Sequence, residues 1–418
     1  MSAAVPTAAR SQFRWYLSGA SAWFIAFGIQ QVMFSYLVTT VLHEAPGMIG
    51  LAQTSLTIVS TLLLLVGGAV ADQVDTRRLL ILSHVIAVVP PMALAAVVGF
   101  GWLRYEWLSV YGLTMGFISA FVLPAREAMM ADVIGPAGRS FLQRAVTTTV
   151  AINFVAQISG MFVARFAATL GAAPIMLFQA AIQLFGAFTA YRLTPSTRHT
   201  DHAEANGVGQ LARIAGGLRE VANSYALLPI TIITAAIGIL FIGTFLVTLP
   251  VILREEYSGD VQQFSSMQIA FWSGSIISSL AISRAGNIAY RGRMVVGAMV
   301  LGTTIQYLMS FSAPLYLFYG LVFVWGLGAG VTISMSRTIV QEHAPPAHRA
   351  RVLSIFQLGF TGGMSIGALA IGFVVEAIGP RHAMLVPAIS MTIVLTTLLA
   401  TTKLWNITAL KHDAEAPA

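Results

Sequence analysis

Few residues in this chain could do ionic chemistry, because only 9% of its 418 residues are charged. Two of them, Arg126 and Glu127, are adjacent and lie inside a long apolar stretch. A charge inside such a stretch is costly, which makes it a candidate for function. Glu127 is the best acid for proton exchange, although its position near one end of the stretch also fits simple solvation. His84 could titrate near neutral pH, or it could be a hydrogen-bonded packing residue.

A second group of charges interrupts the apolar pattern with the sequence GGAVADQVDTRRLL. Asp72 and Asp75 are followed at once by Arg77 and Arg78, and Gly68 precedes them by one helical turn. Carboxylates and arginines at helix ends can hold packed elements in one of two arrangements. They could also only solvate a loop and fix its side of a membrane. The order of the charges favours a role in gating a conformational change.

Neutral polar side chains inside the apolar stretches could line a substrate cavity. Amides with aromatic neighbours suit a sizeable solute that is neutral or amphipathic. The candidates are Gln30 or Gln31, Asn153, Gln157, Phe241, Gln268, Trp272, Gln306 and Gln357. Each amide could equally be a hydrogen-bonding contact between helices.

Long apolar segments must position these residues. A transmembrane helix needs about 20 mostly apolar residues, and twelve segments have that length to within a few residues. They cover 15–42, 47–70, 79–100, 108–131, 145–170, 174–192, 226–253, 264–283, 294–312, 315–340, 352–376 and 382–403. Backbone groups in a bilayer must be hydrogen-bonded internally, so we expect an all-α integral membrane fold. Prolines 90, 91, 124, 250 and 387 lie inside these segments, where we expect kinks.

The composition excludes several classes of protein. Soluble domains are about 25% charged, and 57% of this chain is hydrophobic. The absence of cysteine excludes a disulfide scaffold and a thiolate metal site. The net charge of +7 comes from arginines scattered through short loops, so we expect no nucleic acid partner. No phosphate loop, zinc-protease motif or nucleophile elbow is present, so we expect neither an enzyme nor a cofactor.

The positive charges also predict an orientation. Cytoplasmic loops carry an excess of arginine and lysine. If residues 72–78 are cytoplasmic, most of the cations share that side, and only Arg104, Arg165, Arg254 and Arg381 lie on the other. We therefore expect a multi-pass protein of the cytoplasmic (inner) membrane, with both termini in the cytoplasm.

A polar stretch separates two sets of six segments. We expect an N-terminal half at 1–192, a cytoplasmic linker at 193–225, a C-terminal half at 226–405 and a cytoplasmic tail at 406–418. Within the linker, apolar residues recur at helical spacing over 209–223. This pattern predicts a helix that lies in the membrane interface and tethers the two halves.

The fourth segments of the two halves end in the same pattern of charges. PAREAMMADVIGPAGR and MSRTIVQEHAPPAHR both present an arginine, a carboxylate, a proline and an arginine. The matched pairs are Arg126 with Arg337, Asp132 with Glu342, Pro136 with Pro346 and Arg139 with Arg349. The sequence RAGNIAYRGR is a weaker echo of the Asp72 loop, with its arginines kept and its acids lost. Such a parallel repeat is how transporters build a site between their halves.

Over essentially its full length the chain resembles the major facilitator superfamily. The spacing of Gly68, Asp72, Asp75 and the arginine pair is similar to the superfamily signature between the second and third helices, except at Thr76. The LPAR of the fourth segment and the sequence from Ser336 resemble the branch of enterobactin-type siderophore exporters and macrolide-type drug efflux proteins. The glycine–proline signature of antiporters is not kept in QISGMFVA of the fifth segment.

The resemblance implies twelve helices in two six-helix halves, and it implies roles for the charges. Asp72 would cap the eleventh helix near Arg351 in the outward-facing state, since an anion is favourable at a helix N-terminus. Arg77 or Arg78 would pair with Asp132.

These features predict a secondary active transporter that exports small molecules, drug-like or siderophore-like, by alternating access with proton exchange. The expected partners are a small-molecule substrate, the proton and the lipid bilayer, and we expect a monomer. Two alternatives stay open: a carrier or flippase for a lysolipid or other amphiphile, and a membrane sensor that transports nothing.

Overall fold

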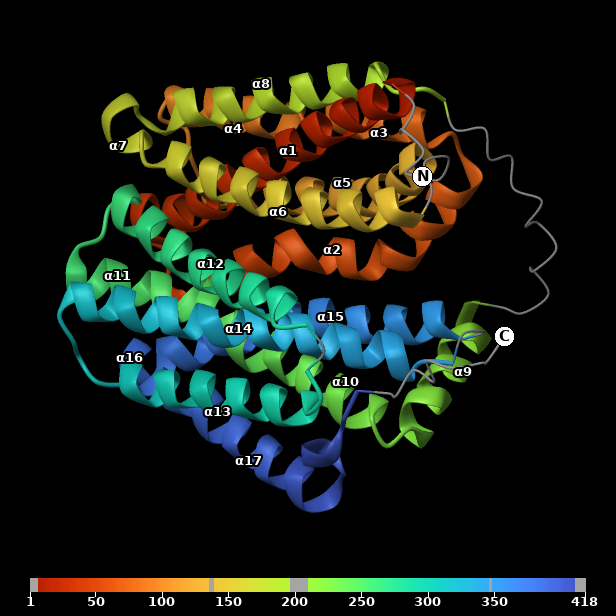
Figure 1. Cartoon of the computed structure of the whole chain (residues 1–418). Coiled ribbons are helices and arrows are strands. Elements are labelled where there is room, and N and C mark those ends of the chain that lie inside the picture. The colour runs from red at the N-terminus through yellow and green to blue at the C-terminus, as the bar shows by residue number, and fades with distance from the viewer. Residues whose placement is uncertain (1–6, 135–138, 196–209, 287, 346–347, 410–418) are drawn as a thin grey trace. The chain divides into compact units, whose positions relative to one another are not determined.

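The computed structural model describes residues 7–134, 139–195, 210–286, 288–345 and 348–409 (Figure 1). Within these ranges the chain is helical and contains no strand, as the apolar segments predict. The chain forms two compact units. The first unit is residues 1–204 with 249–269, and the second unit is residues 205–248 with 270–418.

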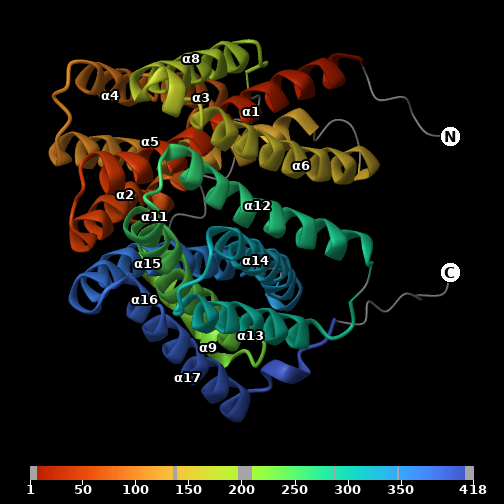
Figure 2. The same cartoon turned by 90° about the vertical axis from the view of Figure 1, so that its left-hand side faces the viewer.

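The first unit is built around α1. Its elements are α1 (Thr7–Tyr36), the π-helical turn η1 (Leu37–Val41), α2 (Pro46–Gln73), α3 (Thr76–Ile86), α4 (Val89–Gly99), α5 (Tyr105–Ile134), α6 (Arg139–Ala164), α7 (Ala167–Leu170), α8 (Ala172–Tyr191), α11 (Leu249–Tyr257) and the start of α12 (Val261–Arg284). Helix α1 packs along α6 and α8, and α2 packs along α5 (Figures 1 and 2). Buried residues of α1, α2, α3, α5 and α8 pack together in one hydrophobic cluster of this unit.

The second unit is built around α15. Its elements are α9 (Gln210–Asn223), α10 (Leu227–Ala236), the π-helical turns η4 (Ile237–Ile242) and η5 (Thr244–Thr248), the rest of α12, α13 (Arg291–Met309), α14 (Leu315–His343), α15 (Arg349–Ile378), α16 (Pro380–Ala383), α17 (Leu385–Thr401) and the 3₁₀ turn η6 (Leu404–Asn406). Helix α15 packs against α9, α10 and η4, while α13 packs against α14 and α17. The predicted linker helix is therefore present as α9, although its tethering role stays a prediction.

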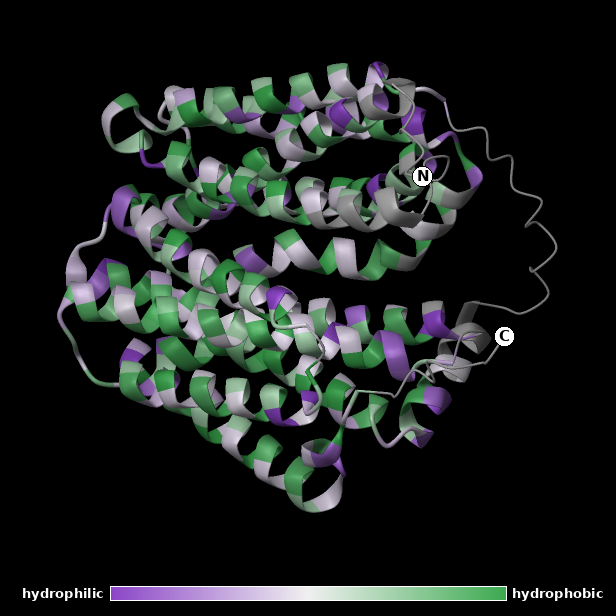
Figure 3. Ribbon diagram, viewed as in Figure 1, coloured by the Kyte–Doolittle hydropathy of each residue, from purple (hydrophilic) through white to green (hydrophobic). Residues whose placement is uncertain are grey.

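Each of the twelve predicted apolar segments is helical, and in the described residues ten helical segments are long and apolar enough to cross a membrane. The segments predicted at 264–283 and 294–312 lie in α12 and α13, which do not meet that criterion of length and composition. Helix α12 is rich in serine, and α13 begins with two arginines. Figure 3 shows hydrophobic residues along the helices and many of the hydrophilic residues near their ends.

The prolines act differently from one segment to the next. The predicted third segment is divided into α3 and α4, with a break at residues 87–88 and the pair of prolines in the first turn of α4. A proline lacks the donor that an α-helix needs and disfavours helical geometry in the residue before it. The kink expected there is therefore an interruption, whereas α5 continues through Pro124. Pro250 and Pro387 lie in the first turns of α11 and α17.

The π-helical turns lie at comparable places in the two sets of segments. Element η1 ends the first apolar segment, and η4 and η5 lie in the last part of the seventh. A π-helical turn changes the backbone hydrogen-bond pattern and is frequent at functional sites. This shared distortion is consistent with a parallel repeat, and the six-helix halves themselves stay a prediction.

Candidate functional site

Arg126 lies in the interior of the first unit. Its side chain extends from α5, and the residue is only 7% exposed. The guanidinium carbon is 4.7 Å from the centroid of the Phe24 ring on α1, and the phenol of Tyr16 is within hydrogen-bonding range. Its Nε has no hydrogen-bond partner. Among the described residues, no carboxylate lies within ion-pairing distance of this guanidinium.

Glu127 follows Arg126 on α5 but is exposed. Successive residues of an α-helix point about 100° apart around its axis, so a buried arginine and an exposed glutamate can be neighbours. An exposed carboxylate suits either solvation or proton exchange, and its coupling role stays a prediction.

His84 of α3 is almost fully buried. Its Nδ1 is 2.9 Å from the Gln183 side-chain oxygen on α8, and its ring packs edge-on against Trp23. An amide oxygen accepts, so we assign the proton to Nδ1 and a neutral imidazole to this site. This is the geometry of a hydrogen-bonded packing histidine.

The charged loop between α2 and α3 is held by local contacts. The carboxylate of Asp75 accepts a hydrogen bond of 3.0 Å from the backbone N–H of Arg77, as is typical of a helix N-cap. Arg78 lies 3.7 Å from the same carboxylate but is largely exposed. Arg77 donates to the backbone oxygen of Tyr191 and lies over its ring. The expected pairing of Arg77 or Arg78 with Asp132 stays a prediction.

The other residues of the predicted gate lie near the ends of α2, α5 and α6. Asp72 lies in the last turn of α2, and Arg139 begins α6, but both side chains lie outside the described residues. Gly68 is open on its side-chain face, since an added Cβ would meet no atom within 4 Å. Asp132 is partly buried at the end of α5. Prolines 136 and 346, matched in the repeat, also lie outside the described residues.

A partly buried ion pair joins α13 to α14 in the second unit. Arg291, which is 8% exposed, pairs with Glu342. Glu342 is the residue matched with Asp132, and Arg291 comes from the loop that echoes the Asp72 loop. The second unit thus contains the kind of pair that the resemblance implies for the first.

The start of α15 carries exposed charges. Arg349 and Arg351 are exposed there, as is Arg337 on α14. His348 immediately precedes Arg349 in sequence, and its Nδ1 is 2.9 Å from the carboxylate of Glu220 on α9. This contact fixes the linker helix to α15 within the second unit.

The candidate amides of the first unit are partly brought together. The Gln157 amide donates to the Gln31 side-chain oxygen at 2.9 Å, joining α6 to α1. Gln30 and Gln268 are buried, and each has a side-chain oxygen without a hydrogen-bond partner. Asn153 is partly buried, and its side-chain oxygen also has no hydrogen-bond partner. The pair of glutamines joins helices, whereas the other three amides have acceptor capacity to spare.

In the second unit the aromatic candidates form a cluster. Phe241 packs edge-on against Trp325, and Trp325 also contacts Phe271. Trp272 packs against Phe271. Gln306 is fully buried, and neither of its amide atoms has a hydrogen-bond partner. Gln357 is exposed on α15.

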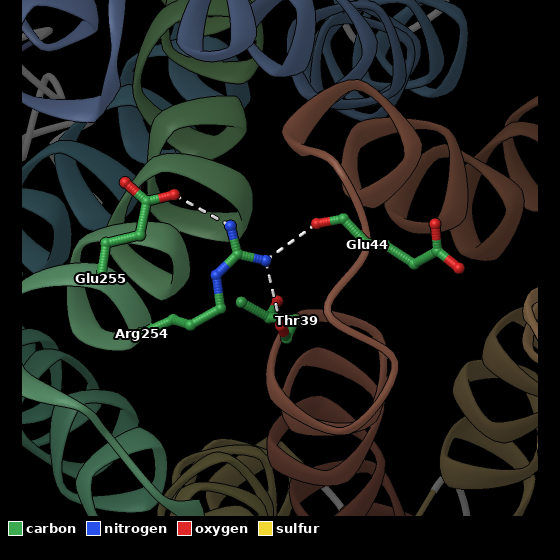
Figure 4. A network of polar contacts seen from close by, with 4 residues as sticks. All are labelled: Thr39, Glu44, Arg254 and Glu255. Atoms are coloured by element: carbon green, nitrogen blue, oxygen red, sulfur yellow. Dashed lines mark hydrogen bonds and ion pairs between the residues drawn. The ribbon is translucent and has the colours of Figure 1, made fainter.

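Arg254, near the end of α11, makes a polar network that the charge pattern alone did not predict (Figure 4). Its Nη1 donates to the backbone oxygens of Thr39 at 3.1 Å and Glu44 at 2.8 Å. Its Nη2 donates to the Glu255 carboxylate at 2.9 Å. The side chain is only 14% exposed. The available signal was a cation on the side of the chain that is poor in cations.

Residues 249–269 therefore belong to the first unit although they follow the linker in sequence. The hydroxyl of Ser265 donates to the backbone oxygen of Met161 at 2.6 Å, and Phe264 packs edge-on against Tyr36. We call residues 249–269, with their contacts to η1, α6 and the loop before α2, the Arg254 clamp.

The family model of transmembrane secretion effectors matches residues 5–417, nearly the whole chain. The chain belongs to this family of major facilitator transporters. A comparison with curated proteins finds no match.

Solved transporter structures share the fold of this major facilitator transporter. A mutant of the nucleoside transporter NupG is 16% identical, with a TM-score of 0.76 over 93% of this chain and 99% of that chain. A bacterial homolog of the human lysosomal transporter Spinster, inward-facing and unoccupied, is 10% identical, with a TM-score of 0.73 over 96% of this chain and 98% of that one. At these identities the likeness shows the fold alone. The fold and the family together establish a multi-pass membrane transporter.

Close packing explains the glycine that this transporter keeps in α6. A Cβ on Gly160 would run into the backbone oxygen of Ile25, and a Cβ on Gly28 would run into that of Gln157. Each helix therefore presents a glycine where the backbone of the other passes. Gly160 has a packing role that needs no adjacent proline.

Proposed function

We propose that this transporter exports small molecules from the cytoplasm by alternating access, with proton exchange and with drug-like or siderophore-like substrates. The observation that carries the proposal is the Arg254 clamp. Alternating access requires one end of the helices to close and reopen, and the clamp joins residues on either side of the linker at the end predicted to face outward. The clamp depends on one side chain, Arg254, which donates to backbone oxygens. These hydrogen bonds can therefore break without the unfolding of a helix.

Export is supported by the family, whose description names secretion. The orientation predicted from the arginines places the clamp on the extracytoplasmic side. A closed clamp there corresponds to a transporter that takes up its substrate from the cytoplasm.

The spare acceptors of Gln30 and Gln268 favour a substrate with N–H or O–H donors. Both amides are buried, and a buried polar atom without a partner costs free energy. A substrate donor would remove that cost. Glu127 is our candidate for proton exchange because it is an exposed carboxylate beside a buried cation.

Proteoliposomes loaded with a pH-sensitive dye and assayed with candidate drugs and siderophores test the proposal. Proton movement that depends on substrate supports the antiporter. Movement of a labelled amphiphile without a pH change would instead favour the carrier or flippase, and binding without flux would favour the sensor. Glu127→Gln should abolish the pH dependence of transport while sparing binding, and an unchanged pH profile would remove Glu127 from the mechanism.

The clamp is tested with Arg254→Gln, for which Glu255→Gln is the matched control. Loss of two charge-assisted hydrogen bonds should disfavour the closed clamp by about 1.5–3 kcal/mol, and we expect turnover to fall at least about tenfold. The chain has no native cysteine, so Thr40→Cys in η1 provides a single site for thiol labelling. Labelling should rise with Arg254→Gln and stay constant with Glu255→Gln. Equal labelling and turnover in both variants would contradict the gating role.

A further inference from the structure

A small cavity adjoins the buried guanidinium of Arg126. It has a volume of about 20 Å³ and lies among α1, α3, α5 and the end of α8. Its lining includes Arg126, Tyr16 and His84, and the rest is mostly apolar. A space of this size beside a guanidinium and a phenol accommodates about one water-sized occupant.

Two glycines line this space and let neighbouring side chains approach closely. A Cβ on Gly19 of α1 would approach the Thr189 hydroxyl to 2.7 Å, and a Cβ on Gly186 of α8 would overlap the His84 ring. Thr189 donates its own proton to the backbone oxygen of Gly186, and His84 is bonded to Gln183. The donors left for an occupant are therefore the Nε–H of Arg126 and the phenol of Tyr16.

In the part of the chain that the structure describes, the guanidinium at the cavity has no carboxylate in direct contact. A buried cation is strongly unfavourable unless it is paired and hydrogen-bonded. Glu127, the next residue, attracts the guanidinium only through exposed surroundings, and no described carboxylate forms an ion pair with Arg126. Phe24 offers only the face of its ring. A water molecule could fill the space but would leave the charge in place.

Two further arginines lie near the end of α8. Arg192 lies over the ring of Trp15, which lines the cavity, and Arg77 lies over the ring of Tyr191. Clustered cations raise the local concentration of anions. The surroundings of the cavity therefore favour an anion, as the buried guanidinium does.

We propose that this cavity binds a small monovalent anion, which in the cell is chloride. The anion accepts hydrogen bonds from Arg126 Nε and the Tyr16 hydroxyl and neutralises the buried guanidinium. Larger or divalent anions such as gluconate and sulfate do not fit. Binding of the anion is measured without a transport assay, so its failure is distinguishable from failure of the proposed export.

The test is thermal unfolding of the purified full-length protein in sodium chloride, sodium bromide and sodium gluconate at equal ionic strength. A ligand that binds only the folded state raises Tm in a saturable way. We expect chloride and bromide to raise Tm by about 2 °C over gluconate, and we expect the protein to retain radioactive chloride on a desalting column. Equal Tm values in the three salts, with no retained chloride, would show that the cavity holds water only.

Variants assign the effect to the cavity. Arg126→Gln and Gly186→Ala should abolish the chloride shift, and Tyr16→Phe should weaken it while keeping the fold. Arg291→Gln is the matched control, because it removes an equally buried arginine that has its own carboxylate, and it should keep the full shift. If Arg126→Gln does not fold, Tyr16→Phe and Gly186→Ala decide. A chloride shift unchanged in both of these variants would overturn the proposal.

Discussion

Two buried arginines, Arg126 in the first unit and Arg291 in the second, have nearly the same exposure but different partners. Arg291 pairs with Glu342, whereas Arg126 has a phenol and the face of an aromatic ring. The cost of burying a guanidinium is similar at both sites, so the difference lies in what offsets it. An arginine with its own carboxylate joins two helices, while one without a carboxylate is available to an external anion.

The repeat sharpens this comparison. The sequence matches Arg126 with Arg337, which is exposed, and Asp132 with Glu342, which is paired. The two segments therefore share an order of charges, but the matched charged residues differ in burial and in the residues that they contact. Arg126 is buried and lines a candidate site, whereas its match Arg337 lies on an exposed surface.

The largest effect should come from Glu342→Gln. Removing one partner of a buried pair leaves an uncompensated charge, which costs about 3 kcal/mol. Chemical denaturation of the detergent-solubilised protein measures this loss. The double variant with Arg291→Gln should recover part of the stability, and a double variant as unstable as the single one would contradict a simple ion pair.

Arg126→Gln should have a smaller effect that depends on the anion. In chloride at roughly 15 times Kd, bound anion contributes about 1.5 kcal/mol to the free energy of unfolding, and the variant loses it. In gluconate the variant should be at least as stable as the parent, because an unpaired charge is gone. The same loss in both salts would mean that Arg126 acts through packing alone.

Asp75→Ala tests the loop of the first unit, whose acids the second unit lacks. Removing an N-cap costs about 1 kcal/mol, and the exposed pair with Arg78 adds little. Circular dichroism during thermal unfolding follows the change. Asp75→Asn keeps the capping oxygen and serves as the control, and equal destabilisation by the two substitutions would assign the effect to charge instead of capping.

Arg337→Gln should have the smallest effect. Exposed substitutions away from special features usually change stability by less than about 0.5 kcal/mol. Unfolding in chloride and gluconate should therefore match that of the parent in both salts. A chloride-dependent loss here would contradict the distinction between the two matched arginines.

The sequence by itself determined the helices of this protein. Segments of about 20 apolar residues must form helices in a bilayer, because every backbone group needs an internal partner, and all twelve predicted segments are helical. Helix α9 followed in the same way from apolar spacing in the linker. These are local properties, set by the residues of one segment.

Only the tertiary structure decided which charges are buried and what they contact. Arg126 and Arg337 occupy matched positions in similar stretches of sequence. Arg126 is buried and Arg337 is exposed, because different helices pack against them. Arg254 finds its acceptors in Thr39 and Glu44, which lie more than 200 positions away in the chain. Side-chain partners depend on which distant helices lie alongside, and a pattern within one segment carries no information about them.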